Sequence, residues 1–268
     1  MIVYGKGRKA RCPSFFVPEA APGARFLVLT GENAAHAKVL RLKPGERVTV
    51  CDAKGTDFQC TVSDVAPGQI SLVVQCEEPS RAEPAVFCSV YMAFAKAEKL
   101  EHVIQKATEL GAGEIVAFPS SRCVAKPDDK ALSKKLERWQ KIAASAAEQS
   151  GRGRIPQVRA LGSFREAVLE ASGCDLALFP YENEKTLSLR DCLNTGGYRN
   201  VSIMTGPEGG FSEEEVALAA ENNMKICSLG PRILRCETAP LCALTAVLYA
   251  SGALDRSADE KDGSHGKE

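Results

Sequence analysis

The sequence predicts an α/β protein in which a small antiparallel β-barrel precedes a parallel sheet covered by helices on both faces. Three observations lead to this prediction. Short β-like runs separated by tight turns occupy residues 26–77, a polar segment with prolines follows, and strand patterns alternate with helix patterns from residue 86 onward. Such alternation is typical of a parallel sheet, whereas closely spaced runs with tight turns favour an antiparallel meander that closes into a barrel.

Length and composition fit an ordinary globular protein. At 268 residues the chain can form one large domain or two modest ones, with 44% hydrophobic and 25% charged residues. No apolar run approaches the roughly 20 residues that span a bilayer, and the amino terminus lacks the apolar core and cleavage site of a signal peptide. We therefore expect a cytoplasmic protein that does not enter a membrane.

Cysteine usage argues against disulfides and against a metal site. The chain has eleven cysteines, an odd number, with no C-x-x-C pair and only three histidines. Cys88, Cys227 and Cys242 lie inside apolar runs, where a cysteine packs as a small hydrophobic residue. We expect reduced structural thiols and no metal ligands.

The zero net charge conceals an uneven distribution. Residues 1–50 contain nine Lys/Arg against three Asp/Glu, a net charge of +6, and residues 94–160 contain thirteen against eight, a net charge of +5. The compensating acid lies mostly in the C-terminal third. Two basic regions on a neutral chain indicate a surface that binds a polyanion, although solvated helix and loop charges remain an alternative.

Residues 1–78 form the predicted barrel domain. Before its central strands, residues 36–43 mix apolar and basic positions in a helical turn or loop, which Pro44 and Gly45 end. Three runs carry the β pattern, with glycine-containing turns between them: residues 47–51, 58–62 and 70–74. We place four cations on an edge that faces RNA: Arg25, Lys38, Arg41 and Lys43.

A polar linker, residues 79–85, leads to the predicted second domain, residues 86–252. One helix pattern covers 98–110 and ends at Gly111, and a longer one covers 128–149. A short helix with a capping box at Ser163 and Glu166 follows. Strand patterns cover residues 86–95, 114–118, 155–161, 176–179 and 201–204. The last residues, 253–268, are polar, and we expect them to be disordered.

The segment from 201 to 249 holds two apolar runs that each end in a glycine turn before a helix pattern. We expect the two turns at the carboxyl ends of neighbouring strands, where an open α/β sheet binds its ligand. The first turn, TGPEGG at 205–210, carries a carboxylate and precedes an acidic helix start, which disfavours a phosphate ligand. It suits a ligand with little net negative charge, although a plain strand-to-helix turn remains open.

The second turn, LGPR at 229–232, is followed by a second arginine and an acid. Arg232 and Arg235 lie three residues apart, and Glu237 follows. An arginine fork can hold a phosphate or stabilise charge on a base carbonyl. The alternative is an Arg235–Glu237 pair that only stiffens the turn.

These loops carry a resemblance to a known family. GPEGGFS at 206–212 and LGPRILRCETAPLCAL at 229–244 resemble the cofactor loops of SPOUT-class RNA methyltransferases. More narrowly, they resemble the ribosomal small subunit methyltransferase E family, which methylates N3 of uracil 1498 in bacterial 16S rRNA. The resemblance covers most of residues 14–250, because three further stretches match in order and spacing: AHAKVLRLKPGERV at 35–48, KAEKLEHVIQKATELG at 96–111 and RWQKIAASAAEQSGR at 138–152.

The resemblance implies an N-terminal PUA-like β-barrel and a C-terminal α/β domain with a deep trefoil knot. It further implies S-adenosylmethionine bound in the knot, 16S rRNA of the small ribosomal subunit as partner, and a homodimer whose second subunit helps to form the site. The family's cofactor contacts correspond to Thr205, Gly206, Glu208, Gly209, Gly210, Leu229, Gly230, Ile233, Leu234, Arg235, Thr238 and Ala239.

The implied reaction is direct transfer of the sulfonium methyl group to uridine N3. This nitrogen is protonated at neutral pH, so the site must supply a base or favour the uridinate anion. We assign Arg235 to stabilise charge on a uracil carbonyl, and Glu237 to orient that arginine or accept the proton. Four cations in loops near the expected active face would hold RNA phosphates: Lys96, Arg122, Arg152 and Arg154.

The chain departs from the family pattern at Ser14, Ser121, Cys236 and Pro240. The sequence leaves other functions as alternatives. The same architecture could modify another base in rRNA or tRNA, or the protein could bind RNA or assist ribosome assembly without catalysis. A nucleotide-dependent phosphotransferase is disfavoured, since the first loop lacks the lysine that its phosphates require.

Overall fold

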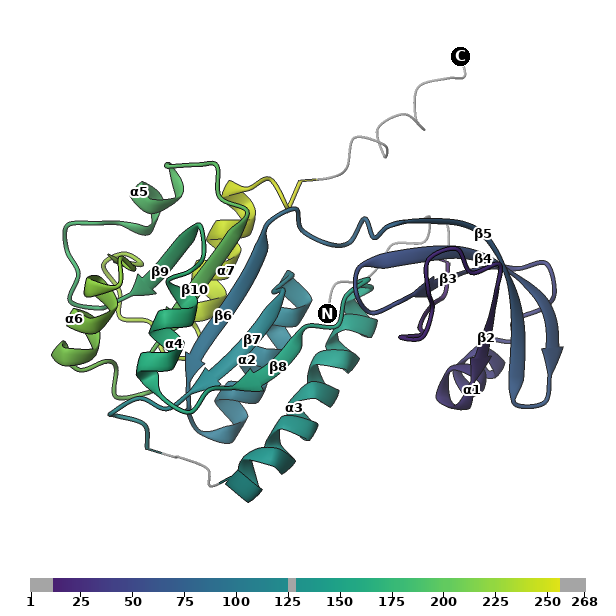
Figure 1. The fold of residues 1–268 in the computed structure, drawn as a ribbon, viewed down its shortest axis with the longest axis horizontal. Helices are drawn as coiled ribbons and strands as arrows, with labels where there is room; N and C mark the ends of the chain where they lie inside the picture. Colours follow the sequence, from purple (N-terminus) through teal and green to yellow (C-terminus); the bar gives the residue numbers. More distant parts are fainter. Residues whose placement is uncertain (1–11, 125–128, 256–268) are drawn as a thin grey trace, which may run out of the picture. The chain divides into compact units, whose positions relative to one another are not determined.

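The computed structural model describes residues 12–124 and 129–255, and the chain divides into two compact units. The first unit contains Met1–Glu83 and Ala147–Ile155, and the second contains Pro84–Ala146 and Pro156–Glu268. Figure 1 labels their helices and strands. Of the tail predicted to be disordered, only residues 253–255 fall within the described range.

The first unit is a curved, five-stranded mixed sheet with one helix, α1 (Gly31–Val39). Its strands lie in the order β1-β3-β4-β5-β2, with β1 parallel to β3 and the other pairs antiparallel. The alternating burial of β2 turns Leu27 and Leu29 into the core. The predicted meander is therefore confirmed: β3 (Arg47–Cys51) matches its predicted range, and β4 (Thr56–Ala66) and β5 (Gln69–Pro79) are longer than predicted. The sheet also contains β1 (Ser14–Phe16) and β2 (Phe26–Thr30).

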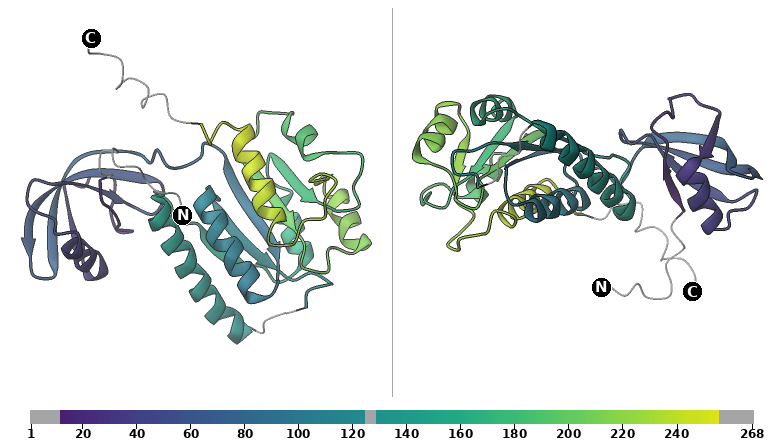
Figure 2. Two further views of the ribbon diagram at one scale, coloured as in Figure 1. Left: turned by 180° about the vertical axis from the view of Figure 1, so that it is seen from behind. Right: turned by 90° about the horizontal axis from the view of Figure 1, so that it is seen from below.

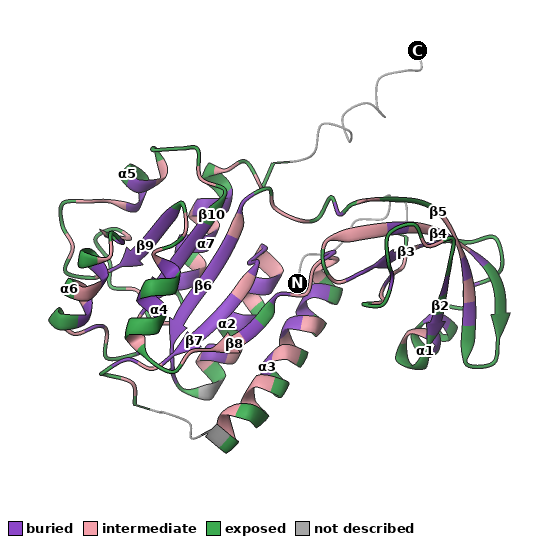
Figure 3. Cartoon of the chain, viewed as in Figure 1, coloured by how far each residue is buried: buried purple, intermediate pink, exposed green. Residues whose placement is uncertain are grey.

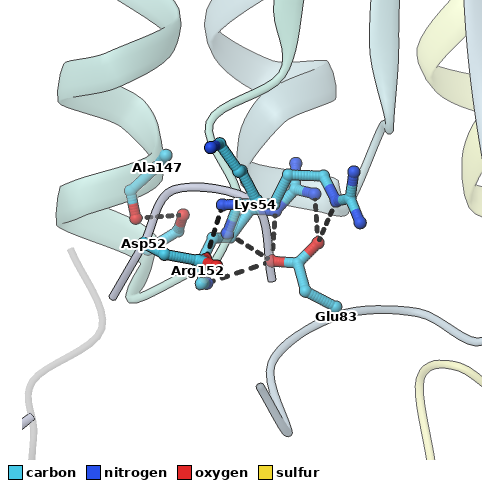
Figure 4. Close-up of polar contacts among 8 residues, drawn as sticks. Asp52, Lys54, Glu83, Ala147 and Arg152 are labelled. Atoms are coloured by element: carbon cyan, nitrogen blue, oxygen red, sulfur yellow. Dashed lines mark hydrogen bonds and ion pairs between the residues drawn. The ribbon is translucent and has the colours of Figure 1, made fainter. Parts of the chain in front are cut away.

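Glu83 fastens residues 147–155 within the first unit. Its carboxylate pairs with the Arg152 guanidinium, at 3.2 Å between Nε and Oε1, and accepts the backbone N–H groups of Gly153 and Arg154 at 3.1 Å each. Figure 4 shows Arg152 turned toward this carboxylate. Gly153 is required, because a Cβ there would lie 2.3 Å from the side chain of Ser80.

The second unit is built on six parallel strands in the order β11-β9-β10-β6-β7-β8. The sequence therefore predicted the parallel arrangement correctly. Figure 3 shows these strands mostly buried, as expected for a sheet covered on both faces. The strands are β6 (Phe87–Ala93), β7 (Glu114–Phe118), β8 (Gln157–Ala160), β9 (Leu176–Pro180), β10 (Asn200–Thr205) and β11 (Lys225–Cys227).

Helices cover the two faces with separate hydrophobic cores. One core contains apolar side chains of α2 (Ala97–Leu110), α7 (Ala239–Ala250) and α3 (Asp129–Ser150), including Trp139. The other contains Ala167 and Val168 of α4 (Phe164–Ala171) and Ala219 of α6 (Glu213–Glu221). Figure 2 shows α2 and α7 on one side of the sheet and α4 and α6 on the other.

The structure corrects one expectation about strand order. The two strands that end in glycine turns, β10 and β11, are not neighbours, because β9 lies between them and pairs with both. The chain reaches β11 only after crossing past β9, and hydrophobic periodicity carries no information about such a crossing. Consequently the carboxyl end of β9 also borders the ligand site.

The sequence reading overlooked the short helix α5 (Leu189–Leu193), although its capping box at Ser188 and Asp191 was visible in the sequence. Among the described helices, none combines the length and the apolar character needed to cross a membrane.

Candidate functional site

The two glycine turns of the second unit open onto one cavity of about 340 Å³ at the carboxyl ends of β9, β10 and β11. This is where an open α/β sheet places its ligand. Of the residues expected to contact a cofactor, Gly209 and Thr238 do not line the cavity. The others do: Thr205, Gly206, Glu208, Gly210, Leu229, Gly230, Ile233, Leu234, Arg235 and Ala239.

The first loop, residues 205–211, is tightly packed. Thr205 at the end of β10 is 2% exposed, and its hydroxyl donates to the Tyr91 carbonyl at 3.4 Å. A Cβ on Gly206 would lie 3.3 Å from the Gly210 backbone and the Phe211 ring, and Gly210 has a φ of +67°. Phe211 packs on Phe179 of β9, with ring centroids 4.3 Å apart. The glycines therefore let the backbone turn closely around the cavity.

Glu215 holds this first loop from behind. It belongs to the capping box that starts α6, accepting the Ser212 N–H at 3.0 Å. The same buried carboxylate accepts the hydroxyl of Ser120 at 3.2 Å and the N–H of Ser121 at 2.8 Å. The segment after β7 is thereby brought against the loop.

Arg122 follows this clamp and covers Gly209. The Arg122 guanidinium donates to the Gly209 carbonyl at 3.3 Å. A Cβ on Gly209 would lie only 3.1 Å from the Arg122 Cβ. Gly209 therefore serves this close contact and does not face the cavity.

The second loop, residues 228–238, is exposed over much of its length. Ile233 is 87% exposed, and Pro231, Arg232 and Arg235 are exposed as well. Gly230 has a φ of +104°, and its N–H donates to the Ser228 hydroxyl at 3.1 Å. Within the described part of the chain, the Arg235 guanidinium has no hydrogen-bond or ion-pair partner. Arg235 is therefore available to a ligand.

Lys99 in the first turn of α2 meets both loops, and the sequence reading overlooked it. Its ammonium lies 3.2 Å from Glu237 Oε2, 3.7 Å from Glu208 Oε1 and 3.8 Å from Cys236 Sγ. Hydrogen bonding to Glu237 raises the pKa of Lys99 despite the opposing effect of desolvation, so the ammonium stays charged. Glu208 also accepts the Lys96 N–H at 3.1 Å, which caps the start of α2.

Glu237 is bound to Lys99 and not to Arg235. The expected Arg235–Glu237 pair is therefore not among the contacts of the described residues, and Glu237 does not orient that arginine in this state. Burial opposes ionisation of Glu237, but its own N–H, the Cys236 thiol and Lys99 outweigh burial and lower its pKa. Burial raises the pKa of Cys236 to about 11, so its thiol stays protonated and donates to Glu237 at 3.3 Å.

The carboxyl end of β9 adds residues that the sequence reading missed. Pro180, Tyr181 and Glu182 line the cavity beside the first loop. Without knowledge that β9 separates β10 from β11, no local signal pointed to them. The lining thus carries three cations, Lys99, Arg232 and Arg235, against the carboxylates of Glu182 and Glu208.

The cations expected to bind RNA have different environments. In the first unit, Arg25, Lys38, Arg41 and Lys43 are exposed, and in the second unit Lys96 and Arg122 are exposed. Arg152 is only 4% exposed and paired with Glu83. We therefore assign Arg152 to the folding of the first unit and withdraw it from the RNA-binding set. Arg154 is half-buried at the same carboxylate.

The eleven cysteines are free thiols, and the described residues contain no cluster of His, Cys, Asp and Glu arranged to hold a metal ion. Of the departures from the family pattern, Cys236 donates as described above, and Ser121 supplies the N–H bound by Glu215. Pro240 is buried in the first turn of α7, where no backbone donor is lost.

Sequence comparisons identify similar proteins along most of the chain. Residues 82–248 match the RNA methyltransferase domain family, and residues 29–75 match the RNA methyltransferase PUA domain family. A "Ribosomal RNA small subunit methyltransferase E" of Bacillus subtilis (strain 168) is 38% identical over 84% of this chain and 91% of its own length. A protein of the same name from Mycobacterium bovis is 31% identical over 92% of this chain and 95% of its own length.

Solved structures agree with these comparisons. The crystal structure of a ribosomal RNA small subunit methyltransferase E from Neisseria gonorrhoeae, bound to S-adenosyl methionine, has a TM-score of 0.76 and 30% identity, covering 89% of this chain and 98% of that one. A putative methyltransferase from Legionella pneumophila, in complex with the same cofactor, has a TM-score of 0.75 and 30% identity, covering 90% and 98%.

Proposed function

The chain belongs to the RNA methyltransferase family that contains the ribosomal RNA small subunit methyltransferases E, and from this premise we propose its reaction. It transfers a methyl group from S-adenosylmethionine to N3 of a uridine, uracil 1498, in the 16S rRNA of the small ribosomal subunit. The observation that carries the proposal is that the two glycine loops share one cavity, which Arg235 lines from the second loop and Glu208 from the first.

The cavity fits S-adenosylmethionine better than a phosphorylated nucleotide. Its size is that of a small-molecule site, and the glycines of the first loop bring the backbone close to a ligand. Glu182 and Glu208 place two carboxylates beside the first loop, where they would complement a cationic sulfonium, while the cations Arg232 and Arg235 lie on the second loop. Backbone of the first loop, the apolar Leu229 and Leu234, and Glu208 would hold the cofactor, which supplies an electrophilic methyl group when bound.

Arg235 has the chemistry to act on the uracil. Its exposed guanidinium would donate to a uracil carbonyl oxygen and stabilise the negative charge that grows as N3 loses its proton. Glu237 is a weak proton acceptor, because its lowered pKa reduces its basicity. We therefore favour stabilisation of the uridinate over proton abstraction by Glu237.

RNA binding would use both units. The exposed Arg25, Lys38, Arg41 and Lys43 and the half-buried Arg154 of the first unit would neutralise phosphates, together with Lys96 and Arg122 in loops of the second unit. Because ribosomes lie in the cytoplasm, this substrate implies that the protein acts there. We further propose that the N-terminal domain ends at residue 78 and that the C-terminal domain begins at residue 86.

We also propose the homodimer and the trefoil knot that the family resemblance implies. Exposed apolar side chains at Ile233 and Tyr249, 87% and 75% exposed, support coverage of the C-terminal segment by a second subunit. Light scattering coupled to gel filtration tests this part: a mass of about twice 28.7 kDa supports the dimer, and a monomer at all concentrations contradicts it.

Calorimetric titration with S-adenosylmethionine tests the proposed function against the non-catalytic alternative. We expect saturable binding by the folded wild-type protein. A folded protein that releases or absorbs no heat would favour an RNA-binding or assembly role. A Glu208→Gln variant should bind the cofactor more weakly, because it removes charge that complements the sulfonium.

A further inference from the structure

We infer that Lys99 is a positioning residue that ties the two loops of the site together and thereby sets the affinity for the cofactor. This inference rests on the proposed function. Lys99 belongs to neither glycine loop, lying instead in the first turn of α2. Its role is to hold Glu208 of the first loop and Glu237 of the second at a common ammonium group.

The geometry of the tie is specific. One ammonium lies 3.7 Å from Glu208 Oε1 and 3.2 Å from Glu237 Oε2, and all three side chains are only 21–24% exposed. Glu208 and Glu237 are 29 positions apart in sequence, on loops that follow different strands. Within the described contacts, no other side chain pairs with carboxylates of both loops. Lys99 is thus the direct ionic connection between them.

The carboxylates need this cation because they would otherwise repel each other. Two carboxylates close to one cavity repel each other, and this repulsion favours their separation unless a positive charge lies between them. The Cys236 thiol, at 3.8 Å from Lys99 and 3.3 Å from Glu237, adds a hydrogen bond but no charge. Loss of the ammonium would therefore remove the ion pair that holds Glu237, in a loop whose residues 230–233 and 235 are exposed.

The first loop has other anchors, so loss of the Lys99 ammonium should affect the two loops unequally. Glu208 keeps the Lys96 N–H, and the buried Thr205 and Phe211 remain packed beneath it. The exposed second loop depends more on Glu237. Removing the Lys99 ammonium should therefore loosen residues 228–238 more than residues 205–211.

The test compares three variants of the full-length protein. Lys99→Met removes the charge and keeps most of the length, and Lys99→Arg keeps a cation that can donate to two carboxylates. Lys106→Met is the matched control, because Lys106 lies on the same helix and, among the described residues, forms an ion pair only with Glu109, at 2.8 Å. Calorimetry measures affinity for S-adenosylmethionine, and hydrogen exchange without cofactor measures opening of each loop.

We expect Lys99→Met to raise the Kd about tenfold and to speed exchange at 228–238, with Lys99→Arg close to wild type and Lys106→Met unchanged. Unchanged affinity and exchange in Lys99→Met would overturn the inference. Equal loss in Lys99→Met and Lys99→Arg would also overturn it, since charge would then not be the cause. A wild type that binds no cofactor, with faster exchange in Lys99→Met alone, would reject the proposed function and retain the tie.

Discussion

The two loops of the site differ in how far the protein itself determines their shape. The first loop is buried at both ends, with Thr205 and Phe211 each 2% exposed, and Glu215 clamps the helix that follows it. The second loop carries Ile233 at 87% exposure and a guanidinium on Arg235 that is free within the described residues. One side of the cavity is therefore formed before ligand binding, and the other side has its functional groups available.

This difference indicates a division of labour. A preorganised loop binds a cofactor without an ordering cost, whereas an exposed loop can adapt to a second substrate or a second subunit. Lys99 joins the two halves. Three predictions test this division, in decreasing order of expected effect.

Substitution of Arg235 tests the exposed half. Arg235→Ala should lower kcat for methyl transfer about a hundredfold or more, because a group that stabilises developing charge is lost. Its thermal unfolding should match wild type, since the exposed guanidinium has no hydrogen-bond or ion-pair partner among the described residues. Steady-state kinetics and a melting curve measure both quantities.

Arg190→Ala provides the control for this substitution. Arg190 is an exposed arginine on α5 and does not line the cavity. Its removal should leave turnover unchanged. If Arg235→Ala retains full turnover, Arg235 has no part in the chemistry.

Two acids at helix starts test the preorganised half: Glu215 completes a capping box at α6, whereas Glu166 at α4 accepts the N–H of Gly162, outside the N-cap. Glu215→Ala should reduce the free energy of unfolding by about 3 kcal/mol, because it removes a cap, leaves the buried Ser120 hydroxyl without this acceptor and releases the Ser121 N–H. Glu166→Ala should cost only about 1 kcal/mol. The Glu166 carboxylate caps the start of α4 in the same sequence pattern but is exposed. Denaturant unfolding of both variants gives the comparison, and equal costs would contradict the clamp.

Lowering the pH tests the ionic connection that Lys99 makes between the two loops. We expect this to be the smallest of the three effects. The pKa values of Glu208 and Glu237 lie below the ordinary 4.5, so their attraction to Lys99 stabilises the protein above about pH 4.5. This contribution is lost as pH falls through the lowered values. The difference in Tm between wild type and Lys99→Met should therefore be present at pH 7 and shrink in acid. A difference that is constant with pH would argue for lost packing.

Local signals in the sequence predicted local structure well. Gly111, with a φ of +119°, ends α2 where expected, and the acidic helix start expected after the first turn is that of α6, which begins at Glu213. The strand at 114–118 matches β7 residue for residue. Each of these features depends on neighbours within a few positions, so periodicity and turn chemistry were sufficient.

Features that depend on distant parts of the chain were not predictable in this way. Arg152 lies in a basic, glycine-containing stretch that has the sequence character of a solvated loop. In the structure it is buried and paired with Glu83, which lies 69 positions away in the sequence. In the sequence, Lys99 looks like an ordinary lysine on a helix surface. Only the folded structure brings the loops of Glu208 and Glu237 against it. The position of β9 between β10 and β11 is likewise a property of the assembled sheet.

Transfer of labelled methyl groups to unmethylated small ribosomal subunits tests the central claim most directly. The protein, S-adenosylmethionine carrying the label and subunits are incubated, and the modified nucleotide is then mapped. We predict label on N3 of uracil 1498 with the wild-type protein, and labelling slowed about a hundredfold or more with Arg235→Ala. Label on any other base, or no label with folded wild-type protein that binds the cofactor, would contradict the account.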